Sequence, residues 1–250
     1  MHRIAFLLLL SSLLAAAPMV PVRAQGGFGD WIGKGAALLG ERDEGTEGQG
    51  TGRSEAEAGL REALVVGIRR VVAGLGRPGG FLDSRRFHIP LPSPFAEAGR
   101  MLRLVGLSAV AEDLERRMNR AAEQAVTVAE DLFVEAIRNL TFADALGILR
   151  GPADAATRYL ERSTGEALEA RMRPIVEQQL ADTGALALYR RLLGEAADLP
   201  FLGEPETSLT DHVVRRARGA LFTRLAEEEA RIRDNPAARS TELLRRVFGG

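Results

Sequence analysis

Residues 108–140 decide the fold class, and they read SAVAEDLERRMNRAAEQAVTVAEDLFVEAIRNL. The apolar residues recur every three or four positions, so they share one side of an α-helix: Leu114, Met118, Ala121, Ala125, Val128, Leu132, Ala136 and Ile137. A stripe of this kind needs other helices to cover it, because a helix buries its apolar face against a neighbour. We therefore predict a long amphipathic helix at the centre of a helical fold.

Helical signals continue on both sides of this run. Four pairs match the capping box that opens a helix: Ser54 with Glu57, Thr141 with Asp144, Ser163 with Glu166, and Ser208 with Asp211. Residues 89–94 carry three prolines and are predicted to be extended, with Ser93 and Pro94 starting the next helix. Sustained alternation of β-branched residues is missing. We predict an all-α domain over residues 54–250, with about seven to nine mostly antiparallel helices.

The first 53 residues differ from this domain. Residues 1–24 have a positive start, an apolar stretch from Ile4 to Ala17 and small residues before Ala24, the layout of a secretory signal peptide cleaved after Ala24. Fourteen apolar residues are too few to span a hydrocarbon core of about 30 Å. Residues 25–53 are predicted to be a flexible, Gly-rich segment with one short amphipathic piece.

Composition excludes several classes of protein. The sequence has no cysteine, and hence no disulfide, no thiol nucleophile and no lipid-attachment site at the cleavage point. The mature chain would carry 31 basic and 34 acidic residues, a balance unlike the basic excess of nucleic-acid-binding proteins. No mature segment is apolar and long enough to cross a membrane. We expect a periplasmic or extracellular protein that is not tethered to lipid.

Motifs for cofactors and metals are weak. Gly74, Gly76 and Gly79 match a dinucleotide fingerprint as a string, but they end a predicted helix and do not link a strand to one. His88 and His212 lie far apart, without further ligands at metal-binding spacing. We predict no cofactor and no metal site.

The polar residues of residues 112–123 have two interpretations. Asn119, Glu123 and Arg116 share a stripe beside the apolar one, where side chains would be half-buried and would need partners. They form either an interhelical network that fixes the register of the helices or the polar wall of a pocket. We expect Arg120 to join Asn119 and Glu123 to an acidic residue of another helix, Asp144 or Asp154.

Two further groups complete the candidates. The adjacent residues Glu227, Glu228 and Glu229 each lie four positions from an arginine, in the pairs Arg224–Glu228, Glu227–Arg231 and Glu229–Arg233. This spacing favours a solvated ladder of ion pairs on a helix over a site. Asp144 is explained by its capping box alone. The residues predicted to form a polar network or a pocket wall are Asn119, Arg120, Glu123, Asp144, Asp154, Thr157, Glu228 and Arg233. No catalytic residue is assigned.

Several motifs follow one another in a recognisable order. They include Gly59–Leu64, Ile89–Pro92, Met118–Glu123, Thr141–Leu149, Asp154–Tyr159 and Ala226–Arg233. Through them the chain resembles the bacterial domain-of-unknown-function family numbered 4197, over roughly Leu60 to Gly249. The resemblance implies an exported, all-α protein of Gram-negative bacteria and brings no established activity. Relatives are expected to have a proline near Val126–Val128, so the long helix here is predicted to run straighter.

Two functions remain open at this stage. The first is a non-enzymatic helical protein that binds an apolar or amphipathic ligand, or a partner in the cell envelope. The second is a hydrolase that uses two of Asp144, Asp154, Glu123 and Glu228 as acid and base. Convergence of these carboxylates in one cleft would favour the enzyme.

Overall fold

A computed structural model describes the backbone of residues 47–93, 95–196 and 208–234. Within these ranges every regular element is a helix, which confirms the predicted fold class. The elements are α2 (Glu47–Gly76), α3 (Gly99–Leu104), α4 (Ser108–Ala125), the short 3₁₀-helix η1 (Val126–Val128), α5 (Ala129–Arg138), α6 (Phe142–Arg150), α7 (Ala155–Asp182), α8 (Ala185–Ala196) and α9 (Leu209–Asp234). The predicted signal peptide, residues 25–46 of the Gly-rich segment and the final predicted helix lie outside the described residues.

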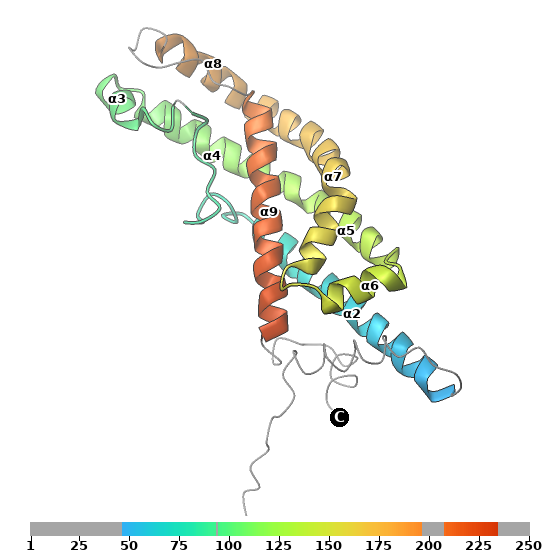
Figure 1. The fold of residues 1–250 in the computed structure, drawn as a ribbon. Coiled ribbons are helices and arrows are strands. Elements are labelled where there is room, and N and C mark those ends of the chain that lie inside the picture. The colour runs from blue at the N-terminus through green and yellow to red at the C-terminus, as the bar shows by residue number, and fades with distance from the viewer. Residues whose placement is uncertain (1–46, 94, 197–207, 235–250) are drawn as a thin grey trace, which may run out of the picture.

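Helix α9 is the element that holds the others together. It packs against α7, α2 and α4, and α7 packs in turn against α4 and α5. Figure 1 shows α9 running across α2 and the α4–α5 run, with α3 and α8 at one end of the molecule. The central place that we expected for residues 108–140 is therefore shared with α7 and α9.

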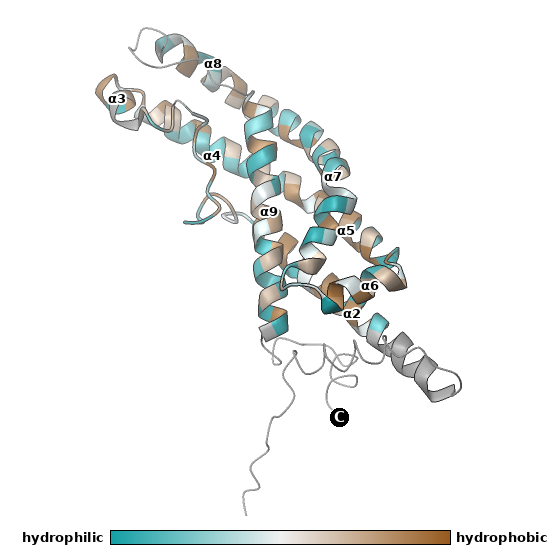
Figure 2. Ribbon diagram, viewed as in Figure 1, coloured by the Kyte–Doolittle hydropathy of each residue, from teal (hydrophilic) through white to brown (hydrophobic). Residues whose placement is uncertain are grey.

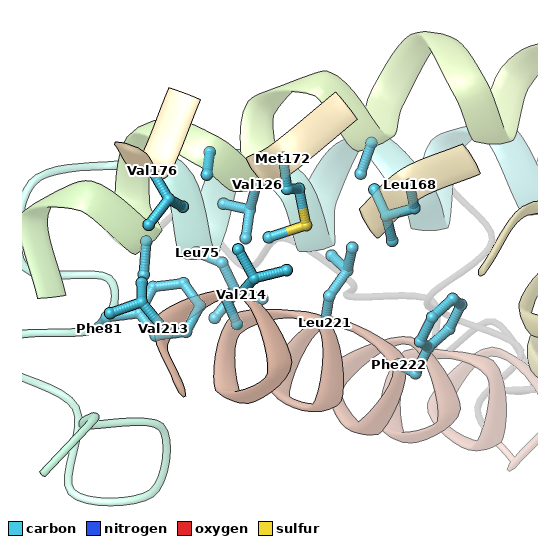
Figure 3. Close-up of a cluster of buried hydrophobic side chains, with 14 of the residues drawn as sticks. Leu75, Phe81, Val126, Leu168, Met172, Val176, Val213, Val214, Leu221 and Phe222 are labelled. Atoms are coloured by element: carbon cyan, nitrogen blue, oxygen red, sulfur yellow. The ribbon is translucent and has the colours of Figure 1, made fainter. Parts of the chain in front are cut away.

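The core lies where these helices meet. Figure 3 shows buried side chains of α9 facing those of α7: Val213, Val214, Leu221 and Phe222 on α9, and Leu168, Met172 and Val176 on α7. Leu75 of α2 and Val126 of η1 lie in the same cluster. Hydrophilic and hydrophobic residues alternate in short stretches along the described helices (Figure 2). Consistent with that pattern, none of the described helices combines the length and the apolarity needed to cross a bilayer.

Two of the four predicted helix starts are confirmed. The Thr141 hydroxyl and the Asp144 carboxylate form a complete capping box at the start of α6. At the start of α9 the backbone N–H of Asp211 donates to the Ser208 hydroxyl, which in turn donates to the Asp211 carboxylate. In both places the local signal decided where the helix begins.

The other two predicted starts are wrong. Helix α2 begins at Glu47, so Ser54 lies inside it and residues 47–53 are helical. Helix α7 begins at Ala155, and Ser163 lies in its third turn, where its hydroxyl donates to the Tyr159 carbonyl. A serine inside a helix can bond to the carbonyl four residues back, so the same residue types occur without a helix start.

Two further expectations need correction. The helix predicted from Ser93 begins instead at Gly99, after a series of turns from residue 95 to residue 98. The long run predicted to be straight is interrupted by η1. At that point the Thr127 hydroxyl donates to the Gln124 carbonyl at 2.7 Å, and a bond of this kind competes with the regular helical ladder.

A pair of glycines directs the chain out of α2. Gly79 has a φ of +81°, a conformation that costs glycine little. At Gly80 a Cβ atom would lie 2.1 Å from the Leu75 carbonyl oxygen, so no side chain fits there. This close turn brings residues 81–93 back along α4 and α9, where they form one wall of the site described next.

Candidate functional site

Helix α4 binds residues 81–91 through one row of polar side chains. Glu115, Asn119 and Glu123 are spaced four residues apart and therefore lie on one face of the helix. The Glu123 carboxylate accepts from the backbone N–H groups of Phe81 and Leu82, both at 3.1 Å. Because residues 81–91 have no partner strand, these side chains take the place of one.

The same row continues along the extended segment. Asn119 accepts from the backbone N–H of Ile89 at 2.8 Å and donates to its carbonyl at 2.9 Å. Glu115 accepts from the N–H of Leu91 at 3.0 Å. On the other side, a ring nitrogen of His212 in α9 donates to the Pro90 carbonyl at 2.9 Å, since a carbonyl only accepts. Residues 89–91 are thus held between α4 and α9.

The structure shows only part of the network predicted for Asn119, Arg120 and Glu123. Arg120 pairs with Glu123, whereas Asn119 bonds to Ile89 and to the Glu115 carbonyl. Arg120 donates to the Glu123 carboxylate at 3.1 Å, and Asn119 and Glu123 are almost fully buried. The structure does not bring Asp144 or Asp154 into this network. Asp144 caps α6, where hydrogen bonds from Thr141 hold its pKa below the usual range, and Asp154 accepts from Arg158 at 2.9 Å.

Arg116, expected to be half-buried beside Asn119, is exposed. It forms an ion pair with Asp113 one turn back on the same helix. Surface pairs of this kind contribute little to stability. The network on α4 is therefore made by Glu115, Asn119 and Glu123, with Arg120 at its edge.

The predicted solvated ladder at the end of α9 is the clearest error. Glu228 and Glu229 are buried, with 4% and 7% of their surface exposed. Glu229 accepts from the backbone N–H groups of Ala156 and Thr157 at 3.0 and 2.9 Å, and from the Thr157 hydroxyl at 2.9 Å. A carboxylate of α9 thus caps the N-terminus of α7, which its own Asp154 does not do.

Arg233 and Glu228 extend this junction of helices. Arg233 pairs with Glu229 and donates to the Ile148 carbonyl near the end of α6 at 3.0 Å. Glu228 accepts from Arg231 of α9 and from Arg70 of α2. Burial raises the pKa of Glu228, but the hydrogen bonds from these two arginines together with their positive charges outweigh this effect and lower the pKa overall. Thr157, Glu228 and Arg233, all on our candidate list, thus bind α2, α6, α7 and α9 together.

A large cavity lies elsewhere, between residues 86–89 and α9. We call it the arginine groove. It has a volume of about 510 Å³, within the range of small-molecule sites. Its lining holds three arginines, a histidine and no carboxylate: Arg86, Phe87, His88, Ile89, Arg215, Arg216, Gly219, Ala220 and Thr223.

The groove combines charge with apolar surface. Guanidinium groups from both walls carry positive charge, and Phe87, Ile89 and Ala220 provide apolar contacts between them. Gly219 lies in the interior of α9, and a Cβ atom there would meet nothing within 4 Å. Glycine inside a helix is less stable than alanine by about 1 kcal/mol. This glycine leaves the groove wider than any other residue would.

The remaining cavities are less suited to a ligand. The two most apolar ones have volumes of about 30 and 20 Å³, no more than the space of one water molecule. A cavity of about 330 Å³ between α6 and α7 is lined by Asp144, Arg158, Tyr159 and Arg162, with charges of both signs. Neither of the two apolar cavities is thus large enough to hold a ligand.

Sequence reasoning missed the groove. His88 and His212, for which we predicted no metal site, both bind carbonyls of residues 81–93. His88 contacts the Leu82 carbonyl at 3.0 Å, and His212 contacts the Pro90 carbonyl. Within the described ranges no three His, Asp or Glu side chains are arranged to hold a metal ion. The nearest signal was the proline-rich stretch 89–94, which we predicted to be extended without assigning it a partner.

Comparison with known proteins identifies the chain as a member of one family. The family model of DUF4197, described as a protein of unknown function, matches residues 50–249. The match covers most of the chain, and the chain therefore belongs to this family, in agreement with the resemblance seen in its motifs. Neither a curated protein nor a solved structure matches the sequence.

Proposed function

We propose that this member of the DUF4197 family is an exported, non-enzymatic protein that binds a small amphipathic anion in the arginine groove. The observation that carries the proposal is the lining of that groove, where cationic side chains flank apolar ones and none of the lining residues is a carboxylate. Arginine suits anions because its guanidinium donates two parallel hydrogen bonds to a carboxylate, sulfate or phosphate group.

Both walls of the groove are held in place by contacts with the rest of the protein. Its loop wall is fixed by the hydrogen bonds of Asn119 to Ile89 and of His212 to Pro90. Its other wall is a helix held in the core. A site with a rigid frame loses little entropy when a ligand binds. The polar network on α4 thus has a structural role that serves the groove.

Export is the second part of the proposal. It rests on the layout of residues 1–24 and on the absence of cysteine from the sequence. Cleavage after Ala24 would leave a chain that begins at Gln25. A binding protein without a lipid anchor fits a location in the periplasm or outside the cell.

The hydrolase that we considered as the alternative has no observation in its favour. Glu123 binds residues 81 and 82, Glu228 binds arginines of α2 and α9, and Asp144 and Asp154 contact residues of their own helix starts. These four carboxylates serve separate contacts and do not meet in one described cavity. General acid–base hydrolysis needs two such groups on either side of one substrate bond.

Fluorescence titration with anilinonaphthalene sulfonate tests the proposed function. This dye is an apolar ring system with one anionic group, so it has the chemistry that the groove should accept. We expect saturable binding to the folded wild-type protein and loss of binding in Gly219→Glu, which places a carboxylate in the groove. Gly194→Glu is the matched control, because Gly194 is also an exposed helical glycine with no atom within 4 Å of its Cβ position.

Two outcomes would contradict the proposal. One is equal dye binding by wild-type protein and Gly219→Glu. The other is equal binding by a neutral apolar dye of similar size, which would assign no role to the arginines. Thermal melts of all variants must show cooperative unfolding, since partly folded states bind this dye without specificity.

A further inference from the structure

We infer that the arginine groove orients its ligand, with the anionic group beside Arg216 and the apolar part directed toward Thr223. This inference rests on the proposed function and adds to it the polarity and length of the ligand. Its basis is a difference between the two cationic ends of the groove. Arg86 at one end is already paired with a carboxylate of the protein, whereas no described carboxylate pairs with Arg216 at the other end.

The direction of the two walls follows from two contacts. The Pro90 carbonyl accepts from His212 near the start of α9, whereas Arg86 pairs with Glu227, four turns further along that helix. Residues 86–90 therefore run antiparallel to α9. Arg86 marks one end of the groove, and Arg215 and Arg216 mark the other.

The Arg86 end already holds an anion that the protein itself supplies. Glu227, one turn beyond the lining residue Thr223 on α9, pairs with Arg86 and accepts from Arg224 at 2.9 Å. The guanidinium of Arg86 also lies over the Phe87 ring, 5.7 Å from its centroid. The carboxylate neutralises the charge of Arg86, so this end attracts a further anion only weakly.

At the opposite end the Asp211 carboxylate lies within range of the charge of Arg215, but no carboxylate of the described residues pairs with Arg216. Arg216 is exposed and makes no hydrogen bond or ion pair with another described residue. Burial lowers the pKa of the neighbouring His212, and the charges of Arg216 and Arg215 lower it further, which places both guanidinium groups at this end of α9. A carboxylate, sulfate or phosphate group beside Arg216 would meet positive charge and an unused donor.

Small side chains lie between the two ends. Gly219 and Ala220 form the floor on α9, opposite Phe87 on the loop wall. From Arg216 to Thr223 the helix rises by roughly 10 Å, which is the length of about eight methylenes. The ligand we infer is therefore a single-headed amphiphile with a short apolar chain, and the Arg86–Glu227 pair ends the space for that chain.

Isothermal titration with n-alkyl sulfates tests this inference. We would use butyl, hexyl, octyl and decyl sulfate below their micelle concentrations, with wild-type protein, Arg216→Gln and Arg86→Gln. Affinity should rise about threefold to fourfold for each added methylene, until the octyl chain, and then level off. Arg216→Gln should lower the affinity for every chain length by about tenfold or more. Arg86→Gln, at a residue that is also exposed, should lower it less than threefold.

The results of this titration distinguish a failure of the inferred ligand orientation from a failure of the proposed function. If no alkyl sulfate binds, both are overturned. If the sulfates bind but Arg86→Gln lowers affinity as much as Arg216→Gln does, the orientation is wrong and the groove remains the site. Affinity that continues to rise through decyl sulfate would show that the Arg86–Glu227 pair does not close the groove.

Discussion

Replacement of Glu123 by alanine should destabilise the protein and loosen one wall of the arginine groove. Only 3% of the Glu123 surface is exposed, and its carboxylate accepts from the backbone N–H groups of Phe81 and Leu82. Each buried donor left without a partner costs about 1–3 kcal/mol. We therefore expect Glu123→Ala to lower the free energy of unfolding by about 3–5 kcal/mol, the range seen when a buried charged partner is removed.

Two related variants serve as comparisons for the expected loss of unfolding free energy in Glu123→Ala. Glu123→Gln keeps one acceptor oxygen and loses only the charge, so its cost should be about 1–2 kcal/mol. Arg120→Ala removes the ion pair but leaves both backbone hydrogen bonds, and the Arg120 side chain is 47% exposed. Its cost should stay within about 1 kcal/mol, as for other exposed pairs.

Urea denaturation followed by circular dichroism measures all three variants. Linear extrapolation gives the free energy of unfolding, and an unchanged slope shows that the same surface is exposed. The order Glu123→Ala, then Glu123→Gln, then Arg120→Ala follows from the hydrogen bonds that each variant loses. Equal losses in Arg120→Ala and Glu123→Ala would refute the reasoning, because the stabilising contact would then be the ion pair and not the two backbone donors.

Three further predictions concern α9. Glu229→Ala should lower the free energy of unfolding by about 2–4 kcal/mol, because it leaves the N-terminus of α7 without its cap. Chemical denaturation measures this loss, and an unfolding free energy equal to that of the wild type would show that Glu229 does not stabilise α7 as a cap. Burial lowers the pKa of His212, so the folded protein resists a proton that the unfolded chain accepts, and stability should fall as the pH drops below about 6.5. Between pH about 7.5 and 5.5, the melting temperature should change less with pH for His212→Gln than for wild type. The same change with pH in both proteins would contradict this prediction. Gly219→Ala should raise the melting temperature through a gain of up to about 1 kcal/mol, whereas a lower value would mean that the groove floor is packed.

The fold class was predictable because periodicity is a local property. The apolar stripe of residues 108–140 and the capping boxes of Thr141 and Ser208 involve residues within one or two turns of each other. Ser163 has the same pattern and starts no helix, since the first turn of α7 is instead capped by Glu229. That cap comes from a residue more than 70 positions away, and no local pattern reveals it.

The polar network was half predictable for the same reason. The position of Asn119 and Glu123 beside the apolar stripe indicated that both need partners, and the structure buries both. Their partners are backbone groups of residues 81, 82 and 89, which have no side-chain signature. The sequence instead offered acidic residues, Asp144 and Asp154, as the obvious partners for an arginine.

The arginine groove was not predictable. Its walls are residues 86–89 and 215–223, more than 120 positions apart. On either wall the arginines have the spacing of ordinary surface charges, and only the turn at Gly79 and Gly80 together with the bond from His212 to Pro90 brings them face to face. The sequence also led to a wrong prediction for residues 227–229. Three adjacent acidic residues are typical of a solvated surface, but the structure buries Glu228 and Glu229.

The most direct test of the binding account is a two-dimensional NMR titration of the wild-type protein with octyl sulfate. The backbone amides of Phe87, Gly219 and Ala220 should shift and saturate together, because all three line the arginine groove. The amides of Gly147 and Gly194, which lie on other helices outside it, should keep their positions. Shifts gathered around Gly147 in the cavity between α6 and α7, or no saturable shift at all, would contradict the account.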